Sequence, residues 1–194
     1  MMAMLRNSTM LAMIVLVAAA CAAREPLPAK SATVPAGIDL SGQWRLRDTS
    51  RNSNRQISDA ERMAAGEEES LIPKKPSKNQ SRRKAKDIQV HVFLETGESL
   101  KVTQTGHGLF VSFDRAIVEE YRFGEQRMIA VGPVEADRVS GWENGAYVIE
   151  TRDKAGAMLI ESYRLDDSDT MIRSIQIVYR DEADLDVSQV FDRR

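Results

Sequence analysis

The stretch from residue 170 to residue 193, TMIRSIQIVYRDEADLDVSQVFDR, decides the fold, because large side chains recur in it at every second position. A period of two over five or more residues indicates half-buried β-strands, in which successive side chains point to opposite faces. The connection between the two runs is too short for a helical crossover, so the strands are predicted to be antiparallel. The alternating positions are Met171, Arg173, Ile175, Ile177 and Tyr179, then Leu185, Val187, Gln189 and Phe191.

Shorter alternating runs and turn signals recur from Glu98 onward, and Asn144-Gly145 is the best hairpin signal because both residues tolerate positive φ. With residues 42–47 as an early strand, the chain has about nine short strands. Residues 84–97 fit either a strand or a short helix. Curling removes the exposed edges of a long sheet. We therefore predict a mainly β fold, an antiparallel up-and-down barrel or half-barrel of about eight to nine strands with one or two short helices.

Residues 1–20 have the parts of a signal peptide, with Arg6 followed by an uncharged apolar run over residues 10–20. Eleven helical residues rise only about 16 Å, which is too short for a hydrocarbon core of about 30 Å. The stretch Val17-Ala18-Ala19-Ala20-Cys21 resembles the lipobox of bacterial lipoproteins. This resemblance implies that a diacylglycerol on Cys21 anchors the mature chain to a membrane.

The predicted location is the bacterial cell envelope, anchored to the outer membrane and facing the periplasm, because Ala22 stands where aspartate often marks inner-membrane retention in lipoproteins. The alternative is a secreted, soluble periplasmic protein in which Cys21 is incidental. Residues 21–38 contain three prolines and are predicted to be a flexible tether. The folded domain is predicted over residues 39–194.

A mobile basic insert is predicted within this domain at about residues 51–86. Residues 58–72 could form a short helix with Ser58 as its N-cap and Glu61 three positions later. A run of seven cations without an acid follows, comprising Lys74, Lys75, Lys78, Arg82, Arg83, Lys84 and Lys86. The run could contact anionic lipid, lipopolysaccharide or cell-wall polymer. Alternatively, it is a solvated loop over its own domain, since residues 87–194 carry 12 basic and 21 acidic side chains. Export argues against nucleic acid as a partner.

Two family resemblances concern the domain itself. Gly42-Gln43-Trp44 resembles the Gly-x-Trp opening of lipocalins, which implies that Trp44 closes one end of a barrel and that Arg193 stacks over it. The stretch from Asp39 to Arg193 also resembles uncharacterised proteobacterial exported proteins with a DLSGxW opening, a family that brings no known activity. The matching segments are DLSGQW at 39–44, LKVTQ at 100–104, GWENG at 141–145, ESYRL at 161–165 and VFDR at 190–193.

The sequence offers no catalytic constellation. Its 194 residues are 42% hydrophobic and 29% charged, as in an ordinary soluble domain, and they include one cysteine and two histidines. No nucleophile elbow, phosphate loop or zinc signature occurs, so we predict no enzyme activity, no catalytic residue, no metal and no cofactor. His107 is expected in an exposed turn. Glu119 could be an inward carboxylate with a raised pKa, and a strand edge or a partner arginine such as Arg122 or Arg138 accounts for it equally well.

We therefore expect the function to depend on binding by the surface or the interior of the folded sheet. Five aromatic side chains lie along the predicted strands and could either line an apolar cavity or fill it: Phe113, Tyr121, Phe123, Trp142 and Tyr147. The first hypothesis is a lipid-anchored, non-enzymatic envelope protein that binds a hydrophobic small molecule or an envelope component. The second is a structural or interaction protein whose basic run contacts anionic cell-wall or outer-membrane polymers.

Overall fold

A computed structural model describes residues 24–65, 88–180 and 182–194. These residues form ten β-strands, one α-helix and two short 3-10 helices. The strands are β1 (Gly42–Leu46), β2 (Ser99–Gln104), β3 (Gly108–Phe113), β4 (Ile117–Arg122), β5 (Glu125–Val131), β6 (Val134–Glu143), β7 (Ala146–Asp153), β8 (Met158–Leu165), β9 (Thr170–Tyr179) and β10 (Glu182–Arg193). The helices are η1 (Asp48–Ser50), α1 (Arg51–Ala65) and η2 (Val90–Phe93).

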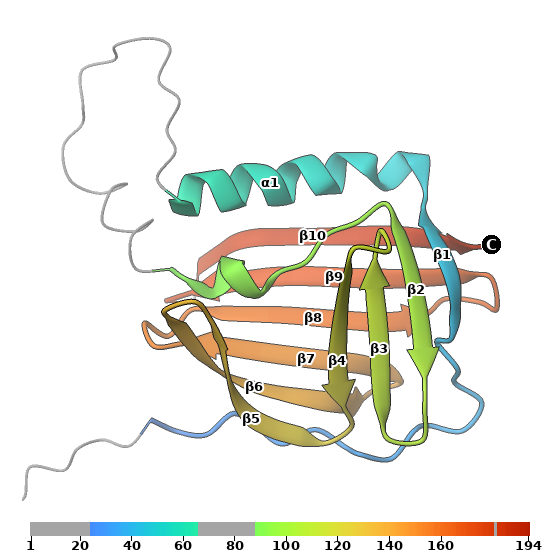
Figure 1. Ribbon diagram of the computed structural model, residues 1–194, viewed down its shortest axis with the longest axis horizontal. Coiled ribbons are helices and arrows are strands. Elements are labelled where there is room, and N and C mark those ends of the chain that lie inside the picture. The colour runs from blue at the N-terminus through green and yellow to red at the C-terminus, as the bar shows by residue number, and fades with distance from the viewer. Residues whose placement is uncertain (1–23, 66–87, 181) are drawn as a thin grey trace, which may run out of the picture.

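All ten strands belong to one antiparallel sheet in the order β4-β3-β2-β1-β10-β9-β8-β7-β6-β5. The first and last strands pair with each other, with Trp44 opposite Arg193, and this pairing turns a linear meander into a barrel. In Figure 1, β2–β4 cross in front of β6–β10. The predicted fold class is confirmed. The structure has ten strands instead of the predicted eight to nine. Residues 125–143 show no clear alternation in the sequence, yet they form the hairpin β5–β6.

The predicted hairpin turn at Asn144-Gly145 is confirmed between β6 and β7, where the two residues have φ of 51° and 79°. The ambiguous segment 84–97 contains the short helix η2 rather than a strand. The helix predicted at 58–72 is present over residues 58–65 but starts earlier than predicted, and residues 66–72 lie outside the described residues. α1 begins at Arg51, directly after η1, so Ser58 lies inside the helix and is not its N-cap. Within the described residues, no helix is long and apolar enough to cross a membrane.

Helix α1 covers the barrel next to β10 (Figure 1). Its Ile57 is fully buried in an apolar cluster with Ile88, Val90 and Phe93 from the η2 region and with Ile175 of β9. This burial, with Ala60 packed against the same cluster, holds the helix against the barrel. The basic run at 74–86 lies outside the described residues.

The segment 24–38, predicted as part of a tether, lies against the outer face of β6 and β7. Ser31 and Trp142 exchange backbone hydrogen bonds of 2.8 and 3.2 Å, and Lys30 forms ion pairs of 2.6 Å with Glu143 and with Glu150. A Cβ on Gly141 would come within 2.5 Å of the Ser31 carbonyl oxygen, so this crossing requires glycine. Covering both faces of β6 explains why its middle residues are buried consecutively rather than alternately.

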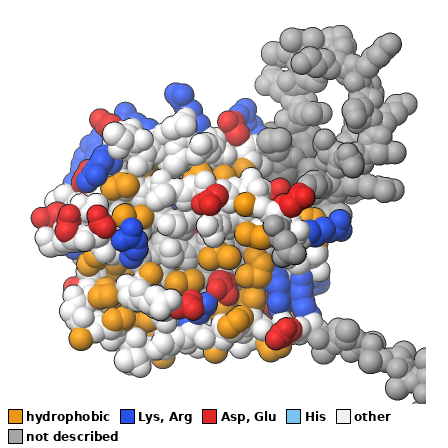
Figure 2. Space-filling model, turned by 180° about the vertical axis from the view of Figure 1, so that it is seen from behind, with side chains coloured by type: hydrophobic (Ala, Val, Ile, Leu, Met, Phe, Trp, Pro, Cys, Tyr) orange, Lys and Arg blue, Asp and Glu red, His pale blue; other side chains and the backbone are white. Residues whose placement is uncertain are grey.

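The barrel interior contains two apolar clusters. One is rich in aromatic side chains and includes Trp44, Trp142 and Phe191. The other lies beneath α1 and η2. On the outer face of β6–β10, Figure 2 shows apolar side chains interrupted by polar and charged ones. The distinctive feature of the fold is therefore inside the barrel, where polar residues separate the two clusters.

Candidate functional site

A layer of inward-facing polar residues crosses the barrel between the two apolar clusters. On β8, β9 and β10, the polar residue is flanked two positions before and two positions after by apolar residues. One of these two belongs to the first cluster and the other to the second. We call this set the polar layer, and it consists of Glu119, Arg138, Thr151, Glu161, Arg173 and Gln189. Buried polar side chains at this density in a small β-barrel mark the candidate site.

Arg173 on β9 is the centre of the polar layer. Its side chain is 0% exposed and forms an ion pair with Glu161, which is 1% exposed. The guanidinium also donates hydrogen bonds to the Gln189 Oε1 at 3.3 Å and to the Glu95 carbonyl at 2.8 Å. Although burial alone would lower the pKa of Arg173, the adjacent Tyr163 and Glu161 raise it, so the side chain stays charged.

Within the described residues, three buried atoms beside this ion pair have no hydrogen-bond partner: Glu161 Oε2, Tyr163 Oη and Arg173 Nε. Tyr163 and Arg173 face each other across β8 and β9, and the guanidinium carbon lies 5.5 Å from the tyrosine ring centroid. Burial raises the pKa of Tyr163, so its hydroxyl keeps its proton. An unpaired buried polar group costs about 1–3 kcal/mol, so these atoms are available to a ligand's polar groups.

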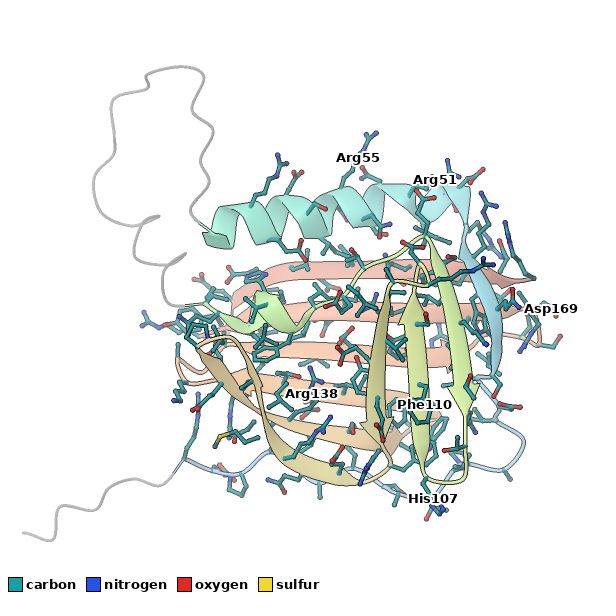
Figure 3. All side chains as sticks on the ribbon, viewed as in Figure 1. Arg51, Arg55, His107, Phe110, Arg138 and Asp169 are labelled. Carbon is teal, nitrogen blue, oxygen red and sulfur yellow. The ribbon has the colours of Figure 1, made fainter. Side chains whose placement is uncertain are left out.

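Arg138 forms the second cationic centre of the layer. Its Nε donates to the Thr151 Oγ1 at 3.0 Å, and its Nη1 lies 3.6 Å from the Glu119 carboxylate. The guanidinium carbon lies 5.5 Å from the Tyr121 ring centroid and 5.9 Å from that of Phe93. In Figure 3, Arg138 is seen in the region between β4 and β5. Of the two partners considered for Glu119, the structure places Arg138 against it.

The polar layer is bonded to both segments that cover this end of the barrel. Gln189 donates hydrogen bonds to Ser53 Oγ at 3.2 Å and to Asn54 Oδ1 at 2.6 Å, both on α1. Arg173 reaches the Glu95 carbonyl, just after η2. The polar layer is therefore in direct hydrogen-bond contact with the helical cover.

Additional carboxylates lie near the polar layer. Burial, together with repulsion from Glu119 and Glu161, raises the pKa of Glu95. Burial and repulsion from Glu95 likewise raise the pKa of Glu61 on α1. Four carboxylates therefore accompany the two arginines, and the region is richer in negative than in positive charge when all are ionised.

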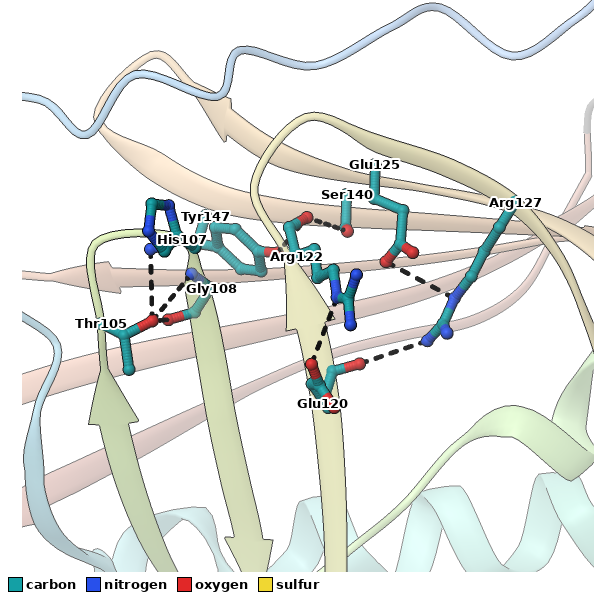
Figure 4. A network of polar contacts seen from close by, with 9 residues as sticks. All are labelled: Thr105, His107, Gly108, Glu120, Arg122, Glu125, Arg127, Ser140 and Tyr147. Atoms are coloured by element: carbon teal, nitrogen blue, oxygen red, sulfur yellow. Dashed lines mark hydrogen bonds and ion pairs between the residues drawn. The ribbon is translucent and has the colours of Figure 1, made fainter.

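The seam between β4 and β5 is the one place where the sheet closes without a backbone ladder. Side chains bridge it instead (Figure 4). The Arg122 carbonyl accepts hydrogen bonds from Ser140 Oγ at 2.8 Å and from Tyr147 Oη at 3.3 Å. Arg127 of β5 donates to the Glu120 carbonyl of β4 at 3.3 Å. The seam has no backbone ladder between its two strands, so we expect it to open at a lower free energy than the paired strands.

The five aromatic residues predicted to line a cavity are all buried in the aromatic cluster. Phe123, Trp142 and Tyr147 are packed with ring centroids 5.4–5.6 Å apart, and Tyr121 lies 6.4 Å from Tyr147. Phe113 lies apart from this group, with its ring 5.0 Å from the Arg173 guanidinium carbon. The structure therefore brings four of them together as packed core and places the fifth against the polar layer.

Trp44 and Arg193 join the first and last strands. The Arg193 guanidinium carbon lies 4.2 Å from the Trp44 ring, and Arg193 donates to the Ser41 carbonyl at 2.6 Å. The indole Nε1 donates to the Leu40 carbonyl at 3.0 Å. This is the stacking that the Gly-x-Trp resemblance implies.

The two histidines lie apart. His107 is exposed in the β2–β3 turn, whereas His91 on η2 is buried, and burial lowers its pKa. Among residues 24–65, 88–180 and 182–194, no three His, Cys, Asp or Glu side chains are arranged to hold a metal ion. Cys21 lies outside these ranges.

Sequence reasoning missed the polar layer, although the signal was present. Arg173 and Gln189 occupy alternating positions otherwise filled by large apolar residues, and both strands were recognised. A charged or amide side chain at such a position indicates a buried polar group. Glu161 carried no comparable signal, because the alternation of β8 is mixed on both faces.

The fold and its interior define a ten-stranded antiparallel β-barrel with a helical cover between β1 and β2 and a buried polar layer. The chain is similar to a secretory abundant heat soluble protein from Ramazzottius varieornatus (TM-score 0.49, 11% identity, 84% of this chain and 100% of that one). It is also similar to Caenorhabditis elegans lipid binding protein 8 (0.47, 12%, 82% and 100%) and to human cRBP IV (0.43, 14%, 81% and 99%). No protein-family model and no curated protein matches the chain.

Proposed function

We propose that this protein is a non-enzymatic binding protein of the bacterial cell envelope, and that its barrel interior takes up an apolar small molecule with a polar end. The observation that carries the proposal is the set of three buried polar atoms beside the Glu161–Arg173 ion pair that have no hydrogen-bond partner among the described residues. Small-molecule sites combine apolar and aromatic walls with a few convergent polar groups, and this interior has both.

A barrel that served only as a rigid scaffold would gain little from such an interior. Replacing a buried ion pair with apolar residues of similar volume is often neutral or stabilising. Each unpaired buried polar group also carries a penalty. The residues of the polar layer therefore lower stability compared with an apolar filling, as expected where a site has a function beyond folding.

Side chains occupy the interior, so uptake requires parts of the barrel to separate. Two regions can do so. The β4–β5 seam is held by side-chain hydrogen bonds and not by a backbone ladder. The helical cover is likewise held to the polar layer by hydrogen bonds from the side chains of Gln189 and Arg173. Local opening of segments with few backbone bonds is the general route by which ligands enter closed sites.

The test is a titration with the neutral fluorescent dye N-phenyl-1-naphthylamine. The chain should begin at residue 22, so that the segment packed on β6 is retained. We expect saturable binding of one dye per chain, with displacement by a long-chain alcohol. The matched control is Val118→Ser with Met128→Ser, which removes exposed apolar side chains (62% and 66% exposed) and should leave binding unchanged. Absence of saturable binding, or its loss in the control variant, contradicts an interior site.

The envelope location rests on the lipobox-like stretch ending at Cys21. We expect metabolic labelling of the wild-type chain with a palmitate analogue and its recovery in the membrane fraction. Cys21→Ser should abolish labelling and release the chain into the periplasmic fraction. Labelling that persists in Cys21→Ser contradicts lipidation at this residue.

Contact with anionic cell-wall or outer-membrane polymers through the basic run is a second candidate. It is supported by the seven cations without an acid between residues 74 and 86. In the Cys21→Ser background, cosedimentation with envelope polymers should decrease as salt rises and should be lost when residues 74–86 are deleted. Unchanged cosedimentation after the deletion overturns this candidate.

A further inference from the structure

We propose that the interior site selects ligands whose polar end is an uncharged hydroxyl or primary amide, and that it discriminates against carboxylates. This inference rests on the proposed binding function and specifies its ligand class. It follows from three properties of the polar layer: how its cations are paired, which charge is in surplus, and which hydrogen-bonding atoms remain free.

Both cations of the polar layer already have anionic partners. Arg173 is paired with Glu161, and both side chains are almost completely buried. Arg138 lies 3.6 Å from the Glu119 carboxylate. An arginine that recognises a ligand carboxylate must offer its charge to that ligand, whereas these two guanidinium groups are neutralised by the protein itself.

The remaining charge near the site is negative. Glu95 follows η2 at the cover, its backbone carbonyl accepts from Arg173, and Glu61 lies beyond it on α1. Burial and then repulsion from Glu119 and Glu161 raise the pKa of Glu95, and burial and then repulsion from Glu95 raise the pKa of Glu61. A ligand carboxylate would add another negative charge to this group in a region that water screens poorly.

The free atoms match a group that both donates and accepts. Arg173 Nε is a donor, Glu161 Oε2 is an acceptor, and the Tyr163 hydroxyl can do either. A hydroxyl or a primary amide can donate to Glu161 Oε2 and accept from Arg173 Nε or Tyr163. A carboxylate only accepts, so it would leave Glu161 Oε2 unpaired and place two anionic oxygens near each other.

The experiment compares probes that share one alkyl chain and differ only at the polar end: dodecan-1-ol, dodecanamide, dodecanoate and dodecan-1-amine. Each displaces N-phenyl-1-naphthylamine from the chain beginning at residue 22, near pH 8, where the acid is ionised. We expect the alcohol and the amide to bind at least about tenfold more tightly than the carboxylate. Dodecanoate that binds as tightly as the alcohol, or as tightly as dodecan-1-amine, overturns the inference while leaving the binding function intact, because the surplus charge at the site is negative. If no probe binds, the proposed function itself fails.

Two variants tie the preference to the polar layer. Glu161→Gln removes the negative charge with little change in shape, so dodecanoate should gain at least about tenfold relative to dodecan-1-ol. Glu135→Gln, which loses an exposed carboxylate paired with Lys154, is the matched control and should leave the ratio unchanged. An unchanged ratio in Glu161→Gln contradicts the inference.

Tyr163→Phe provides a test that does not depend on the folding of Glu161→Gln. It removes a hydroxyl that lies beside the Arg173 guanidinium but meets the geometry of a hydrogen bond with none of the described residues, so thermal stability should change little. Binding of dodecan-1-ol should weaken by about two- to tenfold, because one hydrogen bond to the ligand is lost. Unchanged alcohol affinity in a folded Tyr163→Phe protein places the polar end elsewhere and overturns the inference.

Discussion

Arg173→Met should lower the free energy of unfolding by about 3–5 kcal/mol, because it leaves Glu161 as an unpaired buried carboxylate. The substitution also removes the hydrogen bonds from Arg173 to Gln189 and to the Glu95 carbonyl, which connect the barrel wall with the helical cover. Urea unfolding followed by tryptophan fluorescence measures the change, and the slope of the transition shows whether the folded state remains compact.

Arg164→Met is the matched control for this prediction. Arg164 also carries an ion pair, with Asp166 at 3.2 Å, but both side chains are about half exposed. Its loss should therefore change stability by less than about 1 kcal/mol. The double variant Arg173→Met with Glu161→Leu should recover most of the stability, because an apolar pair replaces the ionic one. Equal effects of Arg173→Met and Arg164→Met would show that the buried pair has no special weight.

Trp44→Ala should be the second strongly destabilising change, lowering the free energy of unfolding by about 3–5 kcal/mol. The side chain is 1% exposed, its indole nitrogen donates to the Leu40 carbonyl, and Arg193 stacks on its ring. Trp44 lies on β1 where this strand pairs with β10. The cavity left by the missing indole would therefore form where the first and last strands join. The same urea titration, followed by far-ultraviolet circular dichroism, measures the loss.

Two variants separate the ring from its surroundings. Phe110→Ala removes an aromatic side chain that is 39% exposed on the outer face of β3, and it should cost about 1 kcal/mol or less. Arg193→Ala removes the stacked cation while keeping the indole, and its effect should lie between those of the other two variants. If Trp44→Ala and Phe110→Ala are equally mild, the closure of the barrel does not depend on Trp44.

Most of the barrel follows from alternation and turn residues. One face of β9 and β10 packs against α1 or the opposite wall of the barrel, and the other face is exposed to solvent. Large side chains therefore recur at every second position of these strands. β6 breaks this rule because the segment 24–38 covers its outer face, and consecutive burial gives no period to detect. The start of helix α1 was predicted too late because its first turns are polar and Ile57 is the first large apolar residue in it.

The candidate site was harder to predict than the fold. Aromatic residues suggested an interior, and the structure confirms that they are buried, but they mostly pack against one another. The polar layer depends on long-range contacts such as Glu161 with Arg173 and Arg138 with Glu119. Sequence spacing does not show which inward polar residues contact one another. Those contacts depend on which strands lie opposite each other once the whole sheet has closed.

The docking of residues 24–38 also determines how far the domain can move from a lipidated Cys21. Arg24 donates to the Asp153 carbonyl at 2.6 Å, and Arg152 donates to the Glu25 carbonyl at 2.7 Å. Three peptide units between Cys21 and Arg24 reach at most about 11 Å. In a chain acylated at Cys21, the β7–β8 turn would therefore lie close to the headgroups, and the domain could not reach far into the periplasm.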